Sequence, residues 1–183
     1  SRLVLIAAGE SNGSGTSGTS GVTGTSGTSG IDGTSGTSGA DGILSGRTYY
    51  FNESQTSDVI IYKKLSDIPS LAAQQVVNKV LTNNEQDVLV QQFITPELGF
   101  TLINGGVQRF HLHYLKPASN DNIETYATIQ LADSAGTPYG PVLQTNVNLI
   151  GWVDSVNPVE VLLDAVFPTT PIATTDRVIV KLY

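Results

Sequence analysis

Glycine occupies every third position from residue 15 to residue 42 without an exception, which makes ten consecutive Gly-X-Y triplets. A strict period of three is typical of collagen, in which three polyproline-II-like chains wind around a common axis. Every third residue faces that axis, where only a hydrogen side chain fits. The pattern therefore predicts a homotrimeric, triple-helical shaft with these residues on its axis: Gly15, Gly18, Gly21, Gly24, Gly27, Gly30, Gly33, Gly36, Gly39 and Gly42.

The predicted shaft contains no proline, because the first proline of the chain is Pro69. No pyrrolidine ring fixes φ within the tract, so ten triplets alone are expected to be marginally stable. Two alternatives stay open: a flexible linker rich in Gly, Ser and Thr, and another helix bundle with glycine at every third position. Collagen is preferred because a flexible linker has no need to exclude glycine from all X and Y positions.

The X and Y positions of the tract are mostly Thr and Ser, and a nine-residue superperiod places one variable triplet after two Thr-Ser triplets. Their hydroxyls would be exposed in a triple helix. At a polyproline-II rise near 3.1 Å per residue, residues 15–44 would span roughly 90 Å.

Charge and composition exclude several classes of partner. Nine Lys and Arg residues against sixteen Asp and Glu residues give a net charge of −7, which argues against binding to nucleic acid or to an anionic membrane surface. Cysteine is absent, so neither disulfides nor thiolate metal sites are expected. No apolar run is long enough to span a membrane.

A short apolar segment precedes the glycine tract, at Leu3, Val4, Leu5 and Ile6, and continues into two alanines. Six apolar residues ahead of a polar rod need burial, so we predict an anchor strand within residues 1–14. This strand would dock on a larger assembly or on the two sister chains. The alternative is a frayed terminus.

Beyond the tract, residues 45–183 have the texture of an all-β domain, with short β-prone runs separated by turn signals such as Asn104-Gly105-Gly106. Many short strands and no convincing long helix predict an antiparallel β-sandwich, specifically a jelly roll, that forms a trimeric head. The predicted strands are 48–51, 59–63, 88–94, 107–115, 124–131, 142–150, 159–167 and 177–182.

Two segments show their sequence pattern in detail. In residues 107–115, alternation places Phe110, Leu112 and Tyr114 on one face, and Arg109 with two histidines on the other. Residues 71–81 are ambiguous: Ser70 could cap a short helix, but the valines also suit a strand, which is the preferred interpretation.

The sequence contains few candidates for catalysis or metal binding. His111 and His113 are the only histidines and share one strand face, but no third ligand is evident, so a structural role is expected and no metal or cofactor is predicted. Carboxylate pairs such as Glu53 with Asp58, or Asp121 with Glu124, lie in loop-like sequence and are interpreted as solvated charge. No G-x-S-x-G elbow occurs, and we predict no enzymatic activity.

Aromatic residues provide two further candidate sites. Trp152 is the single tryptophan, and it is either a core or interface residue or a candidate ligand contact. Tyr49, Tyr50 and Phe51 follow the tract closely, so three chains would gather nine rings at the junction of shaft and head. These rings are predicted to hold the three chains in register.

The combination of a proline-free GTS tract with a β-rich C-terminal head resembles collagen-repeat structural proteins of tailed bacteriophages and large DNA viruses. The stretches that carry this resemblance are residues 15–42, SGRTYYFNES at 45–54, ITPELGFTLINGGVQRFHLHYLKPA at 94–118 and IETYATIQLADSAGTP at 123–138. The resemblance implies a virion fibre or host-contact spike and no catalytic residue. Bacterial collagen-like surface proteins share the architecture, but their tracts usually contain proline, from which this chain departs.

The sequence thus predicts three parts: an anchor at 1–14, a shaft at 15–44 and a head at 45–183. The head would trimerise the shaft and present an adhesion surface to a cell-surface glycan or protein receptor. The predicted location is the virion surface. The alternative is a self-assembling bacterial or extracellular surface filament, in which the N-terminal strand docks on a neighbouring subunit.

Overall fold

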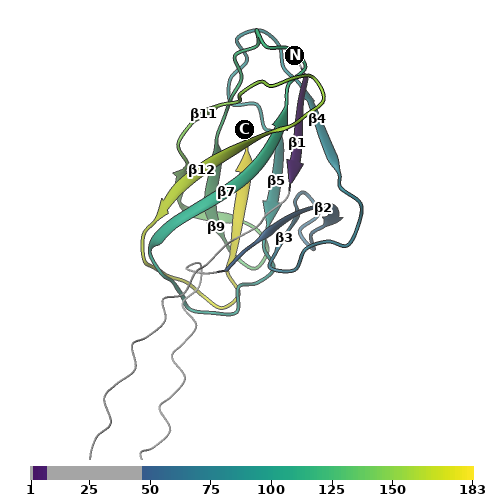
Figure 1. The fold of residues 1–183 in the computed structure, drawn as a ribbon. Helices are drawn as coiled ribbons and strands as arrows, with labels where there is room; N and C mark the ends of the chain where they lie inside the picture. The colour runs from purple at the N-terminus through teal and green to yellow at the C-terminus, as the bar shows by residue number, and fades with distance from the viewer. Residues whose placement is uncertain (1, 8–46) are drawn as a thin grey trace, which may run out of the picture.

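The computed structural model describes the backbone of residues 2–7 and both backbone and side chains of residues 47–183 (Figure 1). Within these ranges the chain forms strands, turns and loops and no helix. The all-β class predicted from the sequence is confirmed for this part of the chain. The glycine positions of the predicted shaft lie outside the described residues.

The described residues form two larger sheets and two short strand pairs. The first sheet has the order β12-β7-β1-β4, and the second has the order β10-β9-β14-β5-β3-β2. The short pairs are β11 with β8 and β13 with β6. The strand bounds are β1 Arg2–Ala7, β2 Tyr50–Thr56, β3 Lys63–Ser66, β4 Val76–Val80, β5 Gln91–Ile94, β6 Leu102–Ile103, β7 Gly106–Leu115, β8 Glu124–Thr125, β9 Ala127–Ala132, β10 Pro138–Gln144, β11 Asn148–Leu149, β12 Val159–Phe167, β13 Thr170–Pro171 and β14 Arg177–Leu182.

The larger of two hydrophobic clusters among the described residues contains side chains from both larger sheets. Strand β7 contributes the alternate residues Phe110, Leu112 and Tyr114, which are buried as the period-two pattern predicts. Strand β12 pairs with β7 along its whole length and buries its own alternate positions. The second sheet contributes buried residues from β5, β9 and β14, including Phe93, Ile129 and Val180.

Strand β1 lies between β7 and β4 and is antiparallel to both. Its backbone register places Leu5 opposite Tyr114 and Val77, and Ala7 opposite Leu112. Among the described strands, β1 is the only partner of β4. The predicted anchor segment thus occupies an interior position of a sheet in the head.

The strands predicted from alternation match the structure closely at 107–115, 159–167 and 177–182, which correspond to β7, β12 and β14. The predicted antiparallel pairing needs one correction, because β3 and β5 are parallel. In residues 71–81 the strand interpretation is confirmed for β4, and residues 71–75 precede it as a loop.

Two predicted strands are displaced, each by a polar residue that bonds to the backbone. Residues 59–62 form a turn, because the Ser57 hydroxyl accepts from Val59 N at 3.2 Å and Tyr62 N donates to Val59 O at 2.9 Å. The predicted strand 142–150 is split into β10 and β11. Between them the buried Thr145 hydroxyl accepts from Ala127 N and donates to Asn146 O, both at 2.9 Å.

Candidate functional site

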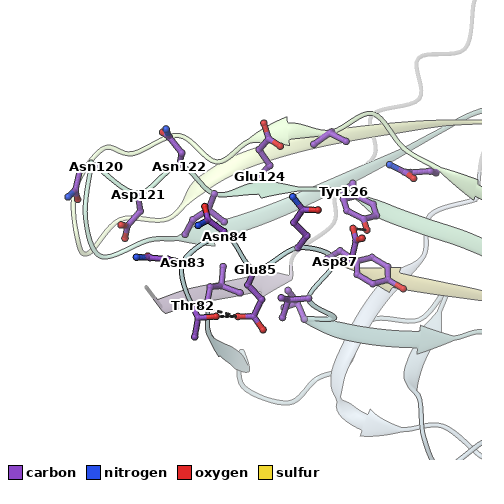
Figure 2. Close-up of a pocket in the computed structure, with 18 residues that line it drawn as sticks. Thr82, Asn83, Asn84, Glu85, Asp87, Asn120, Asp121, Asn122, Glu124 and Tyr126 are labelled. Carbon is purple, nitrogen blue, oxygen red and sulfur yellow. Dashed lines mark hydrogen bonds between the residues drawn. The ribbon is translucent and has the colours of Figure 1, made fainter.

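A large polar pocket opens at one end of the head, with a volume of about 770 Å³. Two loops form most of it: the segment between β4 and β5, and the segment between β7 and β9 (Figure 2). Figure 2 shows these loops facing each other, with Asn83 and Asn84 on one and Asn120–Asn122 on the other. The rest of the lining consists of Gln144, Val147 and Tyr183.

This pocket lies at the end of β1 opposite to the one from which the chain continues. Arg2 pairs with Val80, immediately before the first pocket loop, and Val4 pairs with Leu115, immediately before the second. The chain leaves β1 at Ala7, which lies further along β7 in register with Leu112. The pocket is therefore on the side of the head away from the connection to the glycine tract.

The lining is rich in carboxamide and carboxylate groups, which can donate and accept several hydrogen bonds to a hydroxylated ligand. The polar residues are Thr82, Asn83, Asn84, Glu85, Gln86, Asp87, Asn120, Asp121, Asn122, Glu124 and Gln144. Within the described residues no group of three His, Cys, Asp or Glu side chains is arranged to hold a metal ion.

The first pocket loop is held in shape by its own polar side chains. Thr82 donates both its backbone N and its hydroxyl to Glu85 Oε2, each at 2.9 Å, and these bonds lower the pKa of the Glu85 carboxyl. Asn84 and Asp87 adopt φ of 60° and 52°, a left-handed conformation that Asn and Asp tolerate better than most residues.

A stacked pair of tyrosines forms the aromatic part of the pocket. The rings of Tyr126 and Tyr183 lie 4.9 Å apart between centroids and within 10° of parallel. The Tyr126 hydroxyl donates to Asp87 Oδ1 at 2.5 Å, which ties the ring to the first loop. Burial, and then the Asp87 carboxylate, raise the pKa of Tyr126 to about 12, so the hydroxyl remains a donor at neutral pH.

The second pocket loop is anchored by a buried lysine. Lys116 Nζ donates to the backbone oxygen of Asp121 at 2.7 Å, and the residue is only 4% exposed. Each of the two loops is therefore held by specific hydrogen bonds.

The two histidines lie on the outer face of the first sheet, as alternation predicts, and away from the pocket. His111 Nδ1 lies 3.0 Å from Glu160 Oε1 on the neighbouring strand. On the same face, Arg109 forms a bidentate pair with Asp164 at 2.8 Å for each bond. His113 Nδ1 is buried and has no hydrogen-bond partner among the described residues.

The two carboxylate pairs considered in the sequence lie in different surroundings. Glu53 lies 3.5 Å from Lys63 and accepts from Gln91, whereas Asp58 binds Arg177. Asp121 and Glu124 both line the polar pocket. This pocket was not predicted from the sequence, although Thr82–Glu85 and Ser119–Asn122 are two polar, turn-forming runs that indicate loops.

The aromatic candidates lie in different environments. Trp152 is 43% exposed in the loop before β12, so the core alternative does not apply to it. Phe51 packs into the sandwich, with its ring 4.8 Å from that of Phe93 and 6.0 Å from that of Phe110. Tyr49 also packs against the core, and Tyr50 is half-buried at the start of β2.

No family model, curated protein or solved structure matches this chain. None of the described residues belongs to a helix with the length and apolarity that crossing a membrane requires.

Proposed function

We propose that this chain is a homotrimeric, collagen-like structural protein of a surface fibre. Residues 15–44 form a triple-helical shaft, and the β-rich head is a jelly roll that trimerises it and presents an adhesion surface. The observation that carries this proposal is the unbroken glycine period followed directly by an all-β domain. The chain acts without catalysis or a cofactor.

The head is proposed to supply the register that a proline-free shaft lacks. Residues 47–51 join the tract to the sandwich, and Phe51 is fixed there by two aromatic contacts. The Arg47 guanidinium lies 5.9 Å from the centre of the Phe100 ring, a cation–π distance. The chain is thus attached to the head within a few residues of the tract. This attachment favours a head that fixes the relative register of the three chains in the shaft.

The polar pocket is proposed as the adhesion site, with a cell-surface glycan as its ligand. Its amides, carboxylates and stacked tyrosines suit sugar hydroxyls and sugar ring faces. Its position away from the tract suits contact with a target, because an adhesive surface must project from the particle that carries the fibre. The resemblance to viral collagen-repeat proteins favours the virion surface as that particle.

The shaft is tested with a matched pair of variants in the full chain, Gly27→Val and Ser26→Val. Gly27→Val places three branched side chains on an axis that holds only hydrogens, whereas residue 26 is a Y position that points outward. We expect the parent and Ser26→Val to be trimers with a protease-resistant tract and a collagen-type circular dichroism spectrum. We expect Gly27→Val to lose both tract properties and to keep a folded head. Equal protease sensitivity of all three tracts would refute the shaft.

The adhesion site is tested by binding the full chain to an immobilised glycan panel. Asn84→Gly removes one pocket amide at a position whose positive φ glycine accepts, so the turn is preserved. We expect at least a tenfold loss of glycan binding in this variant, with no loss in Glu97→Ala, an exposed change outside the pocket. Equal glycan binding by Asn84→Gly and Glu97→Ala would contradict the assignment of the pocket as the adhesion site. If the parent protein binds deglycosylated cells but no glycan of the panel, the receptor is a protein.

The filament alternative is supported by one specific observation, the interior position of β1 in the sheet. β1 precedes the glycine tract in the sequence, yet it completes a sheet whose other strands follow the tract. A strand in this position could link one subunit to the next.

A further inference from the structure

One chain cannot both form the proposed straight shaft and place its own β1 in its own head. Ala7 stands opposite Leu112 on β7, and Phe51 stacks on Phe110, two residues along the same strand. At about 3.4 Å per residue, these two contacts on β7 are separated by roughly 7 Å. The two ends of the glycine tract are therefore attached to the head at neighbouring points.

A straight shaft cannot start and finish at neighbouring points of one head. Residues 15–44 would extend over roughly 90 Å in a triple helix. The remaining connecting segments, residues 8–14 and 45–50, reach at most about 50 Å together even when fully extended. They fall short of closing the gap by roughly 40 Å. A chain with an intact shaft thus cannot place its own β1 between its own β4 and β7.

The sister chains of the same trimer cannot supply β1 either. The three chains of a collagen helix run parallel, so all three N-termini lie at the far end of the shaft from the three heads. Every head of such a trimer has an unfilled position between β4 and β7, and every N-terminal segment lies at the opposite end of the particle.

We infer that the strand between β4 and β7 is residues 2–7 of a second copy of this chain that belongs to another trimer. This inference rests on the proposed triple-helical shaft. The exchange satisfies the backbone of β4, whose only partner among the described strands is β1, and it completes the sheet over the core. Addition of an extended segment to open strand edges is a general mode of recognition, because the backbone hydrogen bonds supply affinity.

The register gives the occupant its specificity. The backbone register pairs Leu5 and Ala7 with Tyr114 and Leu112 of β7, which are both fully buried. The apolar run at Leu3–Ile6 is the segment that the sequence predicts to need burial. Linkage from the tail of one trimer to the head of another is heterologous, and such contacts either close into rings or continue as filaments.

The test uses paired cysteines, which is clean because the natural chain contains none. Val4 and Asn78 are directly paired in the register of β1 and β4, so the double variant Val4→Cys/Asn78→Cys should form a disulfide. With an intact shaft, we expect the disulfide to join different chains, giving dimers and larger multiples on a non-reducing denaturing gel. We also expect a native mass by light scattering above that of one trimer.

A second pair and a mismatched pair serve as controls. Ile6→Cys/Val76→Cys, also directly paired, should give the same result if the first pair disturbs folding. Val4→Cys/Asn157→Cys combines β1 with an exposed loop residue and should remain reduced. Adding Gly27→Val to the first pair breaks the shaft and frees the tract to fold back, so the disulfide should move to within single chains.

The outcomes separate this inference from the proposed function. Disulfides within single chains, in a trimer whose tract resists protease, would overturn the exchange and leave the shaft standing. Disulfides within single chains together with a protease-sensitive tract would overturn both the exchange of β1 and the proposed triple-helical shaft. Absence of any disulfide in both directly paired variants would show that residues 2–7 do not occupy this position.

Discussion

Arg177 is a buried guanidinium whose loss should destabilise the head more than any surface change. The residue is 4% exposed at the start of β14. Its Nη1 and Nη2 donate to the two oxygens of Asp58 at 2.8 and 2.6 Å. Nη1 and Nε also donate to the backbone oxygens of Thr95 and Ser134, each at 3.1 Å. One side chain thus joins the 57–62 turn, the residue after β5 and the turn after β9.

The magnitudes follow from which groups each change leaves unpaired. Arg177→Met keeps much of the buried stem but removes the pair with the exposed Asp58, worth about 1 kcal/mol. It also leaves the buried Thr95 carbonyl oxygen without its Arg177 donor, which costs about 1–3 kcal/mol, so we expect a total loss of about 2–4 kcal/mol in unfolding free energy. Asp58→Asn removes charge-assisted bonds worth about 1.5–3 kcal/mol when buried. Because the Asp58 side chain is 66% exposed, we expect only about 1 kcal/mol.

The pH dependence of the unfolding free energy should identify the Asp58 carboxylate as the source of the stability difference between the parent and Asp58→Asn. The hydrogen bonds from Arg177 lower the pKa of Asp58 from 3.8 to about 2. A depressed folded-state pKa contributes stability that is present above the unfolded value and lost as the pH falls through the folded value. The stability difference between the parent and Asp58→Asn should therefore be constant above about pH 5 and be mostly lost by about pH 2.

The assay is urea unfolding of the two proteins side by side at several pH values between 7 and 2. Other carboxylates titrate in both proteins and cancel in the difference. A difference that persists undiminished at pH 2, or that is absent at pH 7, would refute this account of the pair. The same measurement at pH 7 ranks Arg177→Met against Asp58→Asn, and an equal cost would contradict the assignment of the two carbonyl bonds.

Two further predictions concern a turn and the histidines. Gly136→Ala should cost about 2–3 kcal/mol, because φ is +82° and the new Cβ would lie 2.7 Å from Val59 Cγ1. Gly140→Ala, at φ +70° with no atom within 4 Å of the new Cβ, should cost roughly 1 kcal/mol less, and equal costs by thermal unfolding would contradict the contact with Val59. Since His111 is bound to Glu160, purified protein should hold no stoichiometric zinc, nickel or iron, and a chelator should leave its Tm unchanged. Elemental analysis that finds metal, lost in His111→Ala, would show a metal site.

Alternation along single strands predicted much of the head, because it depends only on neighbours in the sequence. Buried positions alternate with more exposed ones along β12 and in β7 from Arg109 onward, although Val107 at the start of β7 is apolar and exposed. The pattern fails where a side chain competes for the backbone. Ser57 turns the apolar run after it into a loop, which leaves Ile60 and Ile61 exposed, and nothing in their hydrophobicity signals that outcome.

The polar pocket could not be predicted in the same way, because its parts come from two loops brought together by strand order. The two pocket loops, Thr82–Asp87 and Asn120–Glu124, become neighbours because β4 and β7 both lie beside β1. The strand between β4 and β7 therefore determines the spacing of the pocket loops.

In the exchange that we infer, the strand between β4 and β7 comes from another trimer. Filling the position between β4 and β7 would then also form the pocket, and glycan binding should require assembled particles. A full chain with Leu3, Val4, Leu5 and Ile6 replaced by Ser should keep its trimeric mass, fail to associate further, and bind the glycan panel at least tenfold more weakly. Unchanged glycan binding by that variant would show that the pocket loops hold their shape without β1.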